Sequence, residues 1–339
     1  MPSGARILTC VPASGWNGDL IVFARGYTAF TEPLDFQNLE IGGIYLPEVA
    51  QRLGFAFATS TYRTNGLAVL SGLEDLRQAT LAFPWVTGKK PRRTFIVGVS
   101  EGGLIAVLAL ERYPELFAGG YSLCGPIGNF QRQAQSFANF RVLFDVYFPD
   151  LLPGGATDVP NELIASWSSL YRPLIESAVL NNLNQAEELL QVSGVAYVPG
   201  DPATLVGSVT GMLWYHTFGT ANAQQVLRGN PFGNETRIYR GSSDDAALNA
   251  AVERVRADPI TASSLRPYET TGKLRRPLVA LHTTGDEIVP FWHQRAYFAK
   301  TRREGSEIWS FPIDRYGHCQ FEFGELIGGL FWMLVLAGR

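Results

Sequence analysis

Residues 94–110 read T-F-I-V-G-V-S-E-G-G-L-I-A-V-L-A-L, and this stretch decides the fold. The run 94–99 predicts a buried strand, 102–112 predicts a helix, and Ser100 lies between them in the pattern Gly-x-Ser-x-Gly. A serine on so sharp a turn adopts strained backbone angles, and the flanking glycines let strand and helix pack closely. The first turn of the helix also directs backbone N–H groups toward negative charge developing above the serine. The stretch therefore predicts a nucleophile at Ser100, with a surface turn serine as the alternative.

The same alternation of strand and helix continues on both sides of this unit. Short apolar or β-branched runs predict strands at residues 20–24, 55–59, 120–124, 278–282 and 308–311. Longer periodic runs predict helices at 46–52, 73–83, about 290–303 and from about 319 onward. Strands that alternate with helices are buried on both faces, so we expect an α/β fold with a mostly parallel central sheet flanked by helices.

A stretch of different character interrupts this pattern after Gly125-Pro126. It contains few strand signals, and Pro/Gly clusters separate its helical segments. Those segments are 131–147, 161–169, 185–192, 205–214 and 246–256. We therefore expect an α/β core in two segments, 1–126 and 276–339, with a mainly helical lid inserted at 127–275.

Composition excludes several classes of protein. Apolar residues make up 46% of the 339 residues, which argues against disorder. With 28 Lys+Arg against 31 Asp+Glu the net charge is −3, so no nucleic-acid partner is expected. The basic run 89–93 contains a proline and precedes a strand, which favours a solvated turn. Four scattered histidines and three cysteines without a C-x-x-C pair exclude a zinc module, so neither metal nor organic cofactor is expected.

The two ends of the chain leave localisation open. Residues 1–6 lack the charged and apolar regions of a signal peptide, which fits either a cytoplasmic protein or a processed extracellular or periplasmic one. The most apolar stretch, 326–338, has an uninterrupted run of about a dozen residues, whereas ~20 are needed to cross a bilayer. We expect a buried C-terminal helix there and no integral membrane segment. The oligomeric state stays open.

A nucleophilic serine needs an imidazole to accept its proton and a carboxylate to fix the imidazole tautomer. On this fold the chain order is serine, acid, histidine. His318 follows the last predicted strand and precedes the last helix, so its loop can reach the carboxyl edge of the sheet, and we predict it as the base. We predict that the other three histidines are structural or line a pocket. They are His282 in a strand, His293 in a helix and His216 in the insertion.

The acid is expected at Asp286, directly after the predicted strand 278–282 and its turn. The alternative for Asp286 is a carboxylate that only stabilises a helix N-terminus. Glu287 and Asp314 compete with it, the first as a solvated neighbour and the second as a capping residue of the His318 loop. The long separation between Ser100 and Asp286 is attributed to the insertion.

The oxyanion hole needs two backbone N–H donors. One donor should come from the residue after the nucleophile, Glu101, and the other from the loop after an early strand. The turn Arg25-Gly26-Tyr27 follows the strand 20–24, so we predict the amide of Tyr27 as the second donor. The Tyr27 ring could line the acyl pocket or be an ordinary turn aromatic.

Taken together, these residues resemble the α/β-hydrolase superfamily of serine esterases, lipases and peptidases over the two core segments, about 190 residues. Arg25-Gly26 stands where many members have His-Gly before the oxyanion donor. The run 26–29 (Gly-Tyr-Thr-Ala) is similar to the oxyanion loop of cutinase-like polyester hydrolases, which lack a large lid.

The run Gly317-His318-Cys319 is also similar to tannase and feruloyl-esterase-like proteins, which place a cysteine after the catalytic histidine. Their partner cysteine precedes the serine, where this chain has Val99. The resemblance therefore implies that Cys319 pairs with Cys10 or Cys124, or stays unpaired.

The leading functional prediction is a serine carboxylic-ester hydrolase that works through an acyl-enzyme. The aromatic residues of the insertion favour a bulky, apolar or aromatic ester, small or polymeric, although they could simply form the core of the lid. A serine aminopeptidase, with Glu101 or Asp244-Asp245 binding the substrate amine, and an acyltransferase are the alternatives on the same fold. A non-catalytic binding protein is the alternative from another class. A dehalogenase is disfavoured because its nucleophile is normally Asp.

Overall fold

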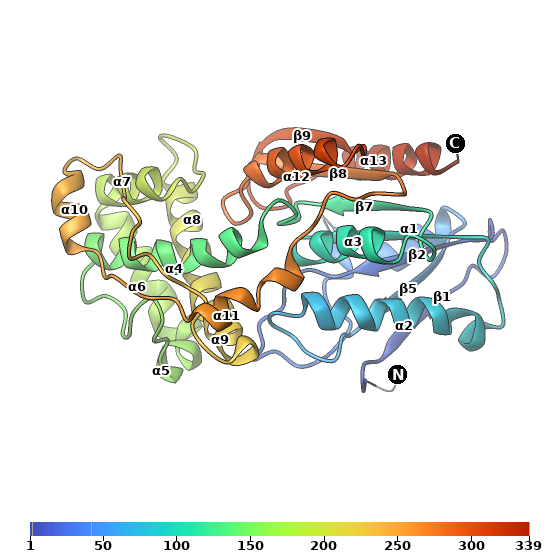
Figure 1. Cartoon of the computed structure of the whole chain (residues 1–339), viewed down its shortest axis with the longest axis horizontal. Helices are drawn as coiled ribbons and strands as arrows, with labels where there is room; N and C mark the ends of the chain where they lie inside the picture. The colour runs from blue at the N-terminus through green and yellow to red at the C-terminus, as the bar shows by residue number, and fades with distance from the viewer. Residues whose placement is uncertain (2, 42, 339) are drawn as a thin grey trace. The chain divides into compact units, whose positions relative to one another are not determined.

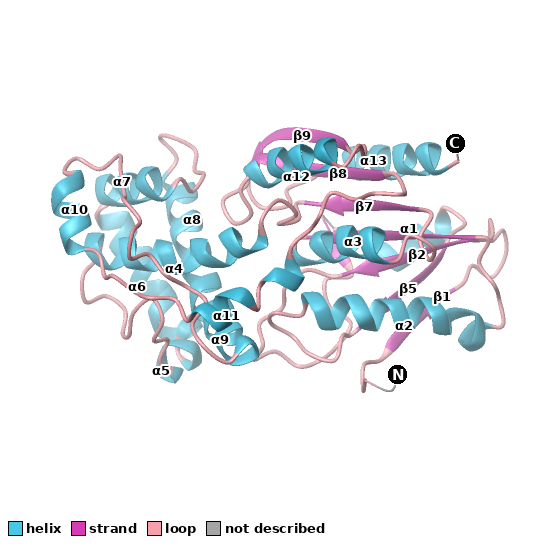
Figure 2. Cartoon of the chain, viewed as in Figure 1, coloured by secondary structure: helices cyan, strands magenta, loops and turns pink. Residues whose placement is uncertain are grey.

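The computed structural model describes residues 1, 3–41 and 43–338 and divides the chain into two compact units. The sheet unit comprises Met1–Asn129, Tyr268–Thr284 and Phe291–Arg339. The helical unit comprises Phe130–Pro267 and Gly285–Pro290. Figure 1 shows the course of the chain, and Figure 2 shows that the sheet lies in one unit and that the other consists of helices and loops.

The sheet unit is built on a seven-stranded sheet of order β1-β5-β2-β6-β7-β8-β9. Neighbouring strands from β5 to β8 run parallel, and β1 pairs antiparallel with β5. The expected mostly parallel sheet is therefore confirmed. Its strands are β1 Ile7–Cys10, β2 Asp19–Ala24, β5 Ala56–Ser60, β6 Arg93–Val99, β7 Gly119–Leu123, β8 Leu278–Gly285 and β9 Trp309–Tyr316.

The strands coincide with the apolar runs of the sequence where both faces of the sheet are covered by other elements. β2, β5 and β7 are buried throughout, as the unbroken apolar or β-branched runs predict. Sequence patterns missed β1 and the short hairpin of β3 (Glu40–Ile41) and β4 (Ile44–Tyr45). These strands are half-buried or exposed, so they lack the unbroken apolar run that marks a central strand.

Helices cover both faces of the sheet. Helices α2 (Val69–Thr87) and α3 (Glu101–Arg112) pack against each other and against the central strands on one face. Helices α1 (Leu46–Arg52) and α13 (Phe323–Ala337) contribute to a hydrophobic cluster on the other face (Figure 1). Helix α12 (Trp292–Arg303) connects β8 to β9.

The C-terminal helix corrects one expectation, because only one of its faces is buried. Leu326, Leu330 and Met333 pack into the core, whereas Phe331 and Trp332 are exposed. The helix forms the outer layer over one face of the sheet, so its other face has no covering element among the described residues. No described helix combines the length and the apolar character that a membrane crossing requires.

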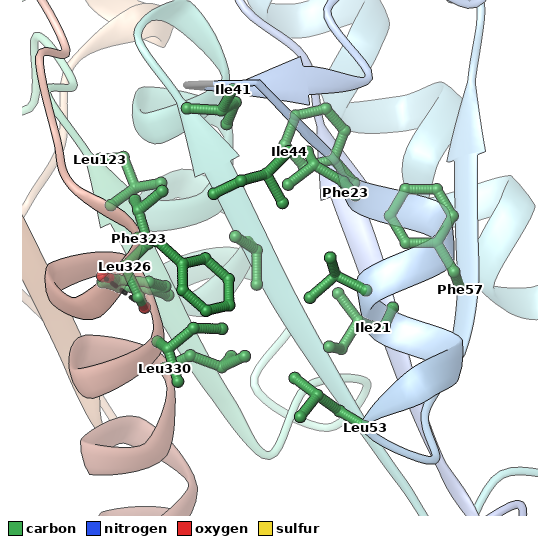
Figure 3. A pocket seen from close by; sticks show the side chains of 16 residues that line it. Ile21, Phe23, Ile41, Ile44, Leu53, Phe57, Leu123, Phe323, Leu326 and Leu330 are labelled. Atoms are coloured by element: carbon green, nitrogen blue, oxygen red, sulfur yellow. Dashed lines mark hydrogen bonds between the residues drawn. The ribbon is translucent and has the colours of Figure 1, made fainter.

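A small apolar cavity of about 80 Å³ lies on the sheet between α1 and α13 (Figure 3). Its lining comes from four strands of the sheet, the β3–β4 hairpin and the two helices, with Ile21, Phe57 and Leu330 among the side chains that line it. Apart from Tyr121, every lining side chain is a hydrocarbon. The cavity therefore belongs to the packing of the core and offers no acid, base or nucleophile.

Among its described residues the helical unit consists of helices, turns and loops. Its helices are α4 Phe130–Tyr147, α5 Asn161–Ala165, α6 Arg172–Asn181, α7 Leu183–Ser193, α8 Pro202–Trp214, α9 Ala221–Leu227, α10 Asp245–Ala251 and α11 Pro259–Ser263. Two π-helical turns, Trp167–Tyr171 and Tyr215–Thr220, interrupt the series, and a 3-10 turn spans Arg266–Tyr268. The helix predicted at 246–256 ends at Ala251, and the one predicted at 161–169 passes into the first π turn.

Candidate active site

Ser100 occupies a strained turn between β6 and α3. Its backbone angles are φ 55° and ψ −120°, in a region that L-residues with side chains rarely adopt. The surroundings hold this conformation: the Ser100 N–H donates to the carbonyl of Leu123 at 2.8 Å, and the Ser100 carbonyl accepts from the N–H of Gly103 at 2.9 Å. The geometry is that of the sharp strand-to-helix turn that the motif predicts.

The glycines of the motif are required by close backbone contacts. A Cβ on Gly98 would lie 1.9 Å from the carbonyl oxygen of Gly102. A Cβ on Gly102 would lie 2.0 Å from the carbonyl oxygen of Ala24. Strand β6, helix α3 and the end of β2 therefore approach one another at backbone distance, and any larger residue would force them apart.

His318 lies beside Ser100 although 218 positions separate the two residues. Its Nε2 is 2.9 Å from Ser100 Oγ, within the range for direct proton transfer. The preceding residue, Gly317, has φ 104°, and its carbonyl accepts a 2.7 Å hydrogen bond from the hydroxyl of Thr283. The end of β8 thus anchors the loop that carries His318. Of the predicted residues, the structure brings Ser100 and His318 together.

A disulfide between Cys124 and Cys319 adds a second anchor to this loop. Cys124 directly follows β7, and the Cys319 Sγ lies 3.4 Å from His318 Nε2. The partner left open by the sequence is therefore Cys124, whereas Cys10 is a free thiol whose pKa is raised by burial. Spacing along the chain could not choose between Cys10 and Cys124, because the choice depends on which strand end meets the His318 loop.

Asp286 directly follows β8, and its side chain is buried. One carboxylate oxygen accepts backbone hydrogen bonds from Ile288 at 3.0 Å and Val289 at 2.7 Å. These bonds order the turn after β8, and the next helix begins only at Trp292, so Asp286 does not occupy the helix N-terminus that the alternative required. Gly285–Pro290 belong to the helical unit. Its competitor Asp314 is exposed and accepts from the Thr284 hydroxyl at 3.0 Å. The role of Asp286 as the triad acid stays a prediction.

The two predicted oxyanion residues flank the nucleophile. Glu101 opens α3, where the N–H groups of the first turn have no partner within the helix. Tyr27 follows Gly26, and a Cβ on Gly26 would lie 3.4 Å from the Cβ of Ser100. The Gly26-Tyr27 turn therefore lies against Ser100.

Two buried charged side chains at the site were not anticipated from the sequence. The Arg25 side chain is 0% exposed, and the Glu101 side chain is 5% exposed. Burial raises the pKa of Glu101 to about 7, while the positive charge of Arg25 and the N–H of Ala68 lower it. The sequence does contain a signal for these buried charges, since each one interrupts an apolar run beside a glycine turn. The sequence patterns marked Arg25 only as a departure from His-Gly and Glu101 only as a backbone donor.

The other histidines are buried in structural positions. His282 Nδ1 lies 3.2 Å from the Gln294 amide, and His293 Nδ1 accepts from the N–H of Gly128 at 3.0 Å. Burial lowers the pKa of His216 to about 3, so this histidine is neutral near pH 7. One group among the described residues has metal-ligand spacing, namely Cys124, His318 and Cys319. Its two sulfurs form the disulfide, so this group does not fit a metal ion in the oxidised protein.

The strand order, the elbow and the flanking helices define the α/β-hydrolase fold. No family model and no curated protein sequence matches the chain. Among solved structures, lipase A from Candida antarctica aligns over 98% of this chain and 72% of its own, at 13% identity and a TM-score of 0.53. Feruloyl esterase B from Aspergillus oryzae aligns over 94% and 71%, at 15% identity and a TM-score of 0.53. Identities this low show the shared fold alone.

An acylaminoacyl peptidase from Pyrococcus horikoshii also matches, at 14% identity and a TM-score of 0.47. The match covers 95% of this chain but 36% of the peptidase, so the chain spans about a third of that protein's length.

Proposed function

We propose that the protein is a serine carboxylic-ester hydrolase that works through an acyl-enzyme. The observation that carries the proposal is the 2.9 Å approach of His318 Nε2 to the hydroxyl of Ser100 on a strained elbow. A serine hydroxyl is a weak nucleophile until such a base accepts its proton. The strained turn at the start of a helix places that hydroxyl beside backbone donors, which acyl transfer requires.

The reaction follows from these positions. His318 Nε2 accepts the Ser100 proton as Oγ bonds to the ester carbonyl carbon, and the carbonyl electrons move to oxygen. The N–H groups of Tyr27 and Glu101 donate hydrogen bonds to that oxyanion. His318 then donates the proton to the leaving alcohol as the C–O bond breaks. Water attacks the acyl-enzyme by the same steps, with His318 as base, and releases the acid and Ser100.

Asp286 is the carboxylate that we propose as the partner of His318. It lies three residues after Thr283, whose hydroxyl binds the carbonyl next to His318. Its side chain is buried and ordered by two backbone N–H groups, which hold the carboxylate in one orientation. A fixed carboxylate holds the proton on His318 Nδ1 and leaves Nε2 to accept from serine.

The substrate that we propose is an ester with a bulky apolar or aromatic group. In the helical unit the rings of Phe137 and Tyr215 stack with centroids 5.1 Å apart, and Trp214 meets Tyr215 at 4.9 Å. These three rings are half-buried, so part of each remains accessible to a ligand. Trp167, by contrast, is buried and serves the core of the unit.

The aminopeptidase alternative needs an acidic group for the substrate amine, and the acids suggested by the sequence are engaged elsewhere. Glu101 is buried and accepts from the N–H of Ala68. Asp244 caps α10 by accepting from Ala247, and Asp245 accepts from Ser242. These contacts favour an ester over a free N-terminal peptide.

The decisive experiment measures hydrolysis of p-nitrophenyl butyrate together with covalent labelling by a fluorophosphonate. Wild-type protein should turn over the ester and take up one label, whereas Ser100→Ala should lose the label and at least about 10⁴-fold of kcat. Ser169→Ala, at an exposed serine of the helical unit, is the matched control and should keep both. Equal rates for wild type and Ser100→Ala would contradict the proposal. An aminoacyl anilide and an added alcohol acceptor, run alongside, distinguish the aminopeptidase and the acyltransferase.

A further inference from the structure

The buried Arg25 guanidinium holds the turn that carries the predicted oxyanion donor Tyr27. Its Nη1 donates to the carbonyl of Gly26 at 3.2 Å and to the Thr28 hydroxyl at 2.9 Å. The Gly26 carbonyl and the Tyr27 N–H belong to one planar peptide and point in opposite directions. A guanidinium that fixes the carbonyl therefore also fixes the direction of the N–H.

The other end of the same guanidinium binds the loop that follows β5. Nη2 donates to the carbonyls of Thr61 at 3.2 Å and Thr64 at 3.4 Å, and to the Asn65 side-chain oxygen at 2.7 Å. The N–H of Gly66 in turn donates to the carbonyl of Thr28 at 2.8 Å. Residues 61–68, which we call the support loop, are thus bonded to both sides of the Tyr27 turn.

The far end of the support loop binds the second predicted donor residue. The N–H of Ala68 donates to the Glu101 carboxylate at 3.0 Å. Glu101 is the first residue of α3, and its own N–H shares a peptide with the Ser100 carbonyl. One loop therefore connects the two residues whose backbone amides flank the nucleophile, through Arg25 at one end and Glu101 at the other.

Burying the charges of Arg25 and Glu101 costs desolvation free energy, which indicates that the arrangement has a role besides folding. Buried charged groups normally have a direct partner of opposite charge, because desolvation disfavours them. Among the described residues neither Arg25 nor Glu101 forms an ion pair, and Arg25 Nε and one Glu101 oxygen lack a hydrogen bond. Buried polar atoms without partners are uncommon in native proteins, so each such atom calls for an explanation.

We propose that Arg25 and Glu101 are positioning residues that orient the two oxyanion donors through the support loop, and that the charge of Arg25 offsets the Glu101 carboxylate beside the developing oxyanion. The inference deepens the proposed function and rests on it. A carboxylate next to the oxyanion hole repels the negative charge of the transition state, and a fixed cation behind the hole counters this repulsion.

Kinetics of Arg25 variants test the positioning role. Arg25→Lys keeps the charge but loses the planar fork, so kcat for p-nitrophenyl butyrate should fall about tenfold or more while KM changes less than about threefold. Inhibition by phenylboronic acid, which forms a tetrahedral adduct on serine, should weaken in parallel with kcat. Arg77→Lys is the matched control, since Arg77 pairs with Glu74 at 2.8 Å on α2 and should leave both values unchanged.

A double-mutant cycle tests the charge role. Glu101→Gln preserves an oxygen that accepts from Ala68 and removes the charge that repels the oxyanion, so kcat should rise above that of wild type. Arg25→Gln should lose about tenfold or more, and Arg25→Gln/Glu101→Gln should regain at least about threefold over Arg25→Gln. A purely structural role would instead make the double variant equal to Arg25→Gln or worse, and that result would overturn the charge role.

Fluorophosphonate labelling separates failure of this inference from failure of the proposed function. If the wild-type protein neither reacts with the fluorophosphonate nor hydrolyses the ester, the proposed function is wrong. If the wild-type protein does both, and Arg25→Lys keeps the wild-type kcat and the wild-type affinity for the boronate, only the positioning role is wrong. If Arg25→Gln does not fold, Thr28→Val is the second variant, because it removes one acceptor of Arg25 with little change of shape. It should lower kcat about threefold, and an unchanged kcat would count against the inference.

Discussion

The sheet unit and the helical unit each bury one arginine completely, Arg25 and Arg141. Both guanidinium groups bind three backbone carbonyls. Those of Arg25 are Gly26, Thr61 and Thr64, and those of Arg141 are Leu152, Pro153 and Gly154. In both units an arginine thus supplies hydrogen bonds to loop carbonyls that no helix or strand pairs.

The two arginines differ in how their charge is balanced. Arg141 Nε donates to both oxygens of Asp145, at 2.7 and 2.8 Å, one helical turn away. Arg25 has no carboxylate in contact, and the nearby Glu101 acts on it only through space. A buried charge that is paired with a carboxylate serves stability. The Arg25 guanidinium stacks over the Tyr62 ring at 4.3 Å and contacts no carboxylate, so its positive charge is not neutralised at the Gly26-Tyr27 turn.

The largest expected effect breaks the paired arginine. Arg141→Met should lower the free energy of unfolding by about 3–5 kcal/mol, because Asp145 and three carbonyls lose their buried partner. Urea denaturation of wild type and variant measures the change, and kcat per folded molecule should stay within about threefold. A loss of stability below about 1 kcal/mol would show that the two arginines are not alike in their structural role.

The next effect concerns the disulfide of the sheet unit, which has no counterpart in the helical unit because all three cysteines lie outside it. Cys124→Ala/Cys319→Ala should lose about 2–4 kcal/mol of stability, since the unfolded chain gains freedom. It should also lower kcat several-fold, because the loop of His318 loses one of its anchors. Cys10→Ser is the matched control and should change neither quantity; equal kcat for all three proteins would contradict the anchoring role.

Glu101→Gln should make stability less dependent on pH. Burial raises the pKa of Glu101 from 4.5 to about 7, so the folded state binds the proton more tightly than the unfolded chain. The stability that this carboxyl contributes is full below pH 4.5 and is lost as the pH rises through about 7. The variant should therefore gain about 2–3 kcal/mol relative to wild type between pH 5 and pH 8. Parallel curves of unfolding free energy against pH would contradict a strained carboxyl at this position.

The sequence was sufficient for the parts of the molecule that depend on local pattern. The apolar runs on both sides of Ser100 predicted β6, the elbow and α3, because strand, turn and helix each leave their own period and glycine spacing. His318 could be chosen from four histidines because the others lie inside regular elements or the insertion. The boundaries of β8 and β9 were placed too short, since their ends carry polar residues that no apolar run marks.

What escaped prediction depends on contacts between distant segments. Helix α6 was missed because its buried positions are few and its other residues are exposed, which weakens the apolar stripe. The partner of Cys319 and the bonds of Arg25 both depend on which loops meet at the edge of the sheet. No spacing rule links Arg25 to residues 61–65, whose carbonyls and amide it binds.

The smallest expected effect concerns the hydroxyl of Thr283, which anchors the His318 loop without carrying a charge. Its removal therefore shows the effect of position alone, whereas removal of either arginine changes position and charge together. Thr283→Val keeps the shape of the side chain and removes the hydroxyl that binds the Gly317 carbonyl at 2.7 Å. One buried carbonyl then lacks its bond, so stability should fall by about 1 kcal/mol. Because Gly317 precedes His318, kcat should fall about two- to fivefold while KM is unchanged. Thr284→Val is the control, as that hydroxyl binds the exposed Asp314, and an equal fall of kcat in both variants would show that the anchor at Gly317 has no special part in placing the base.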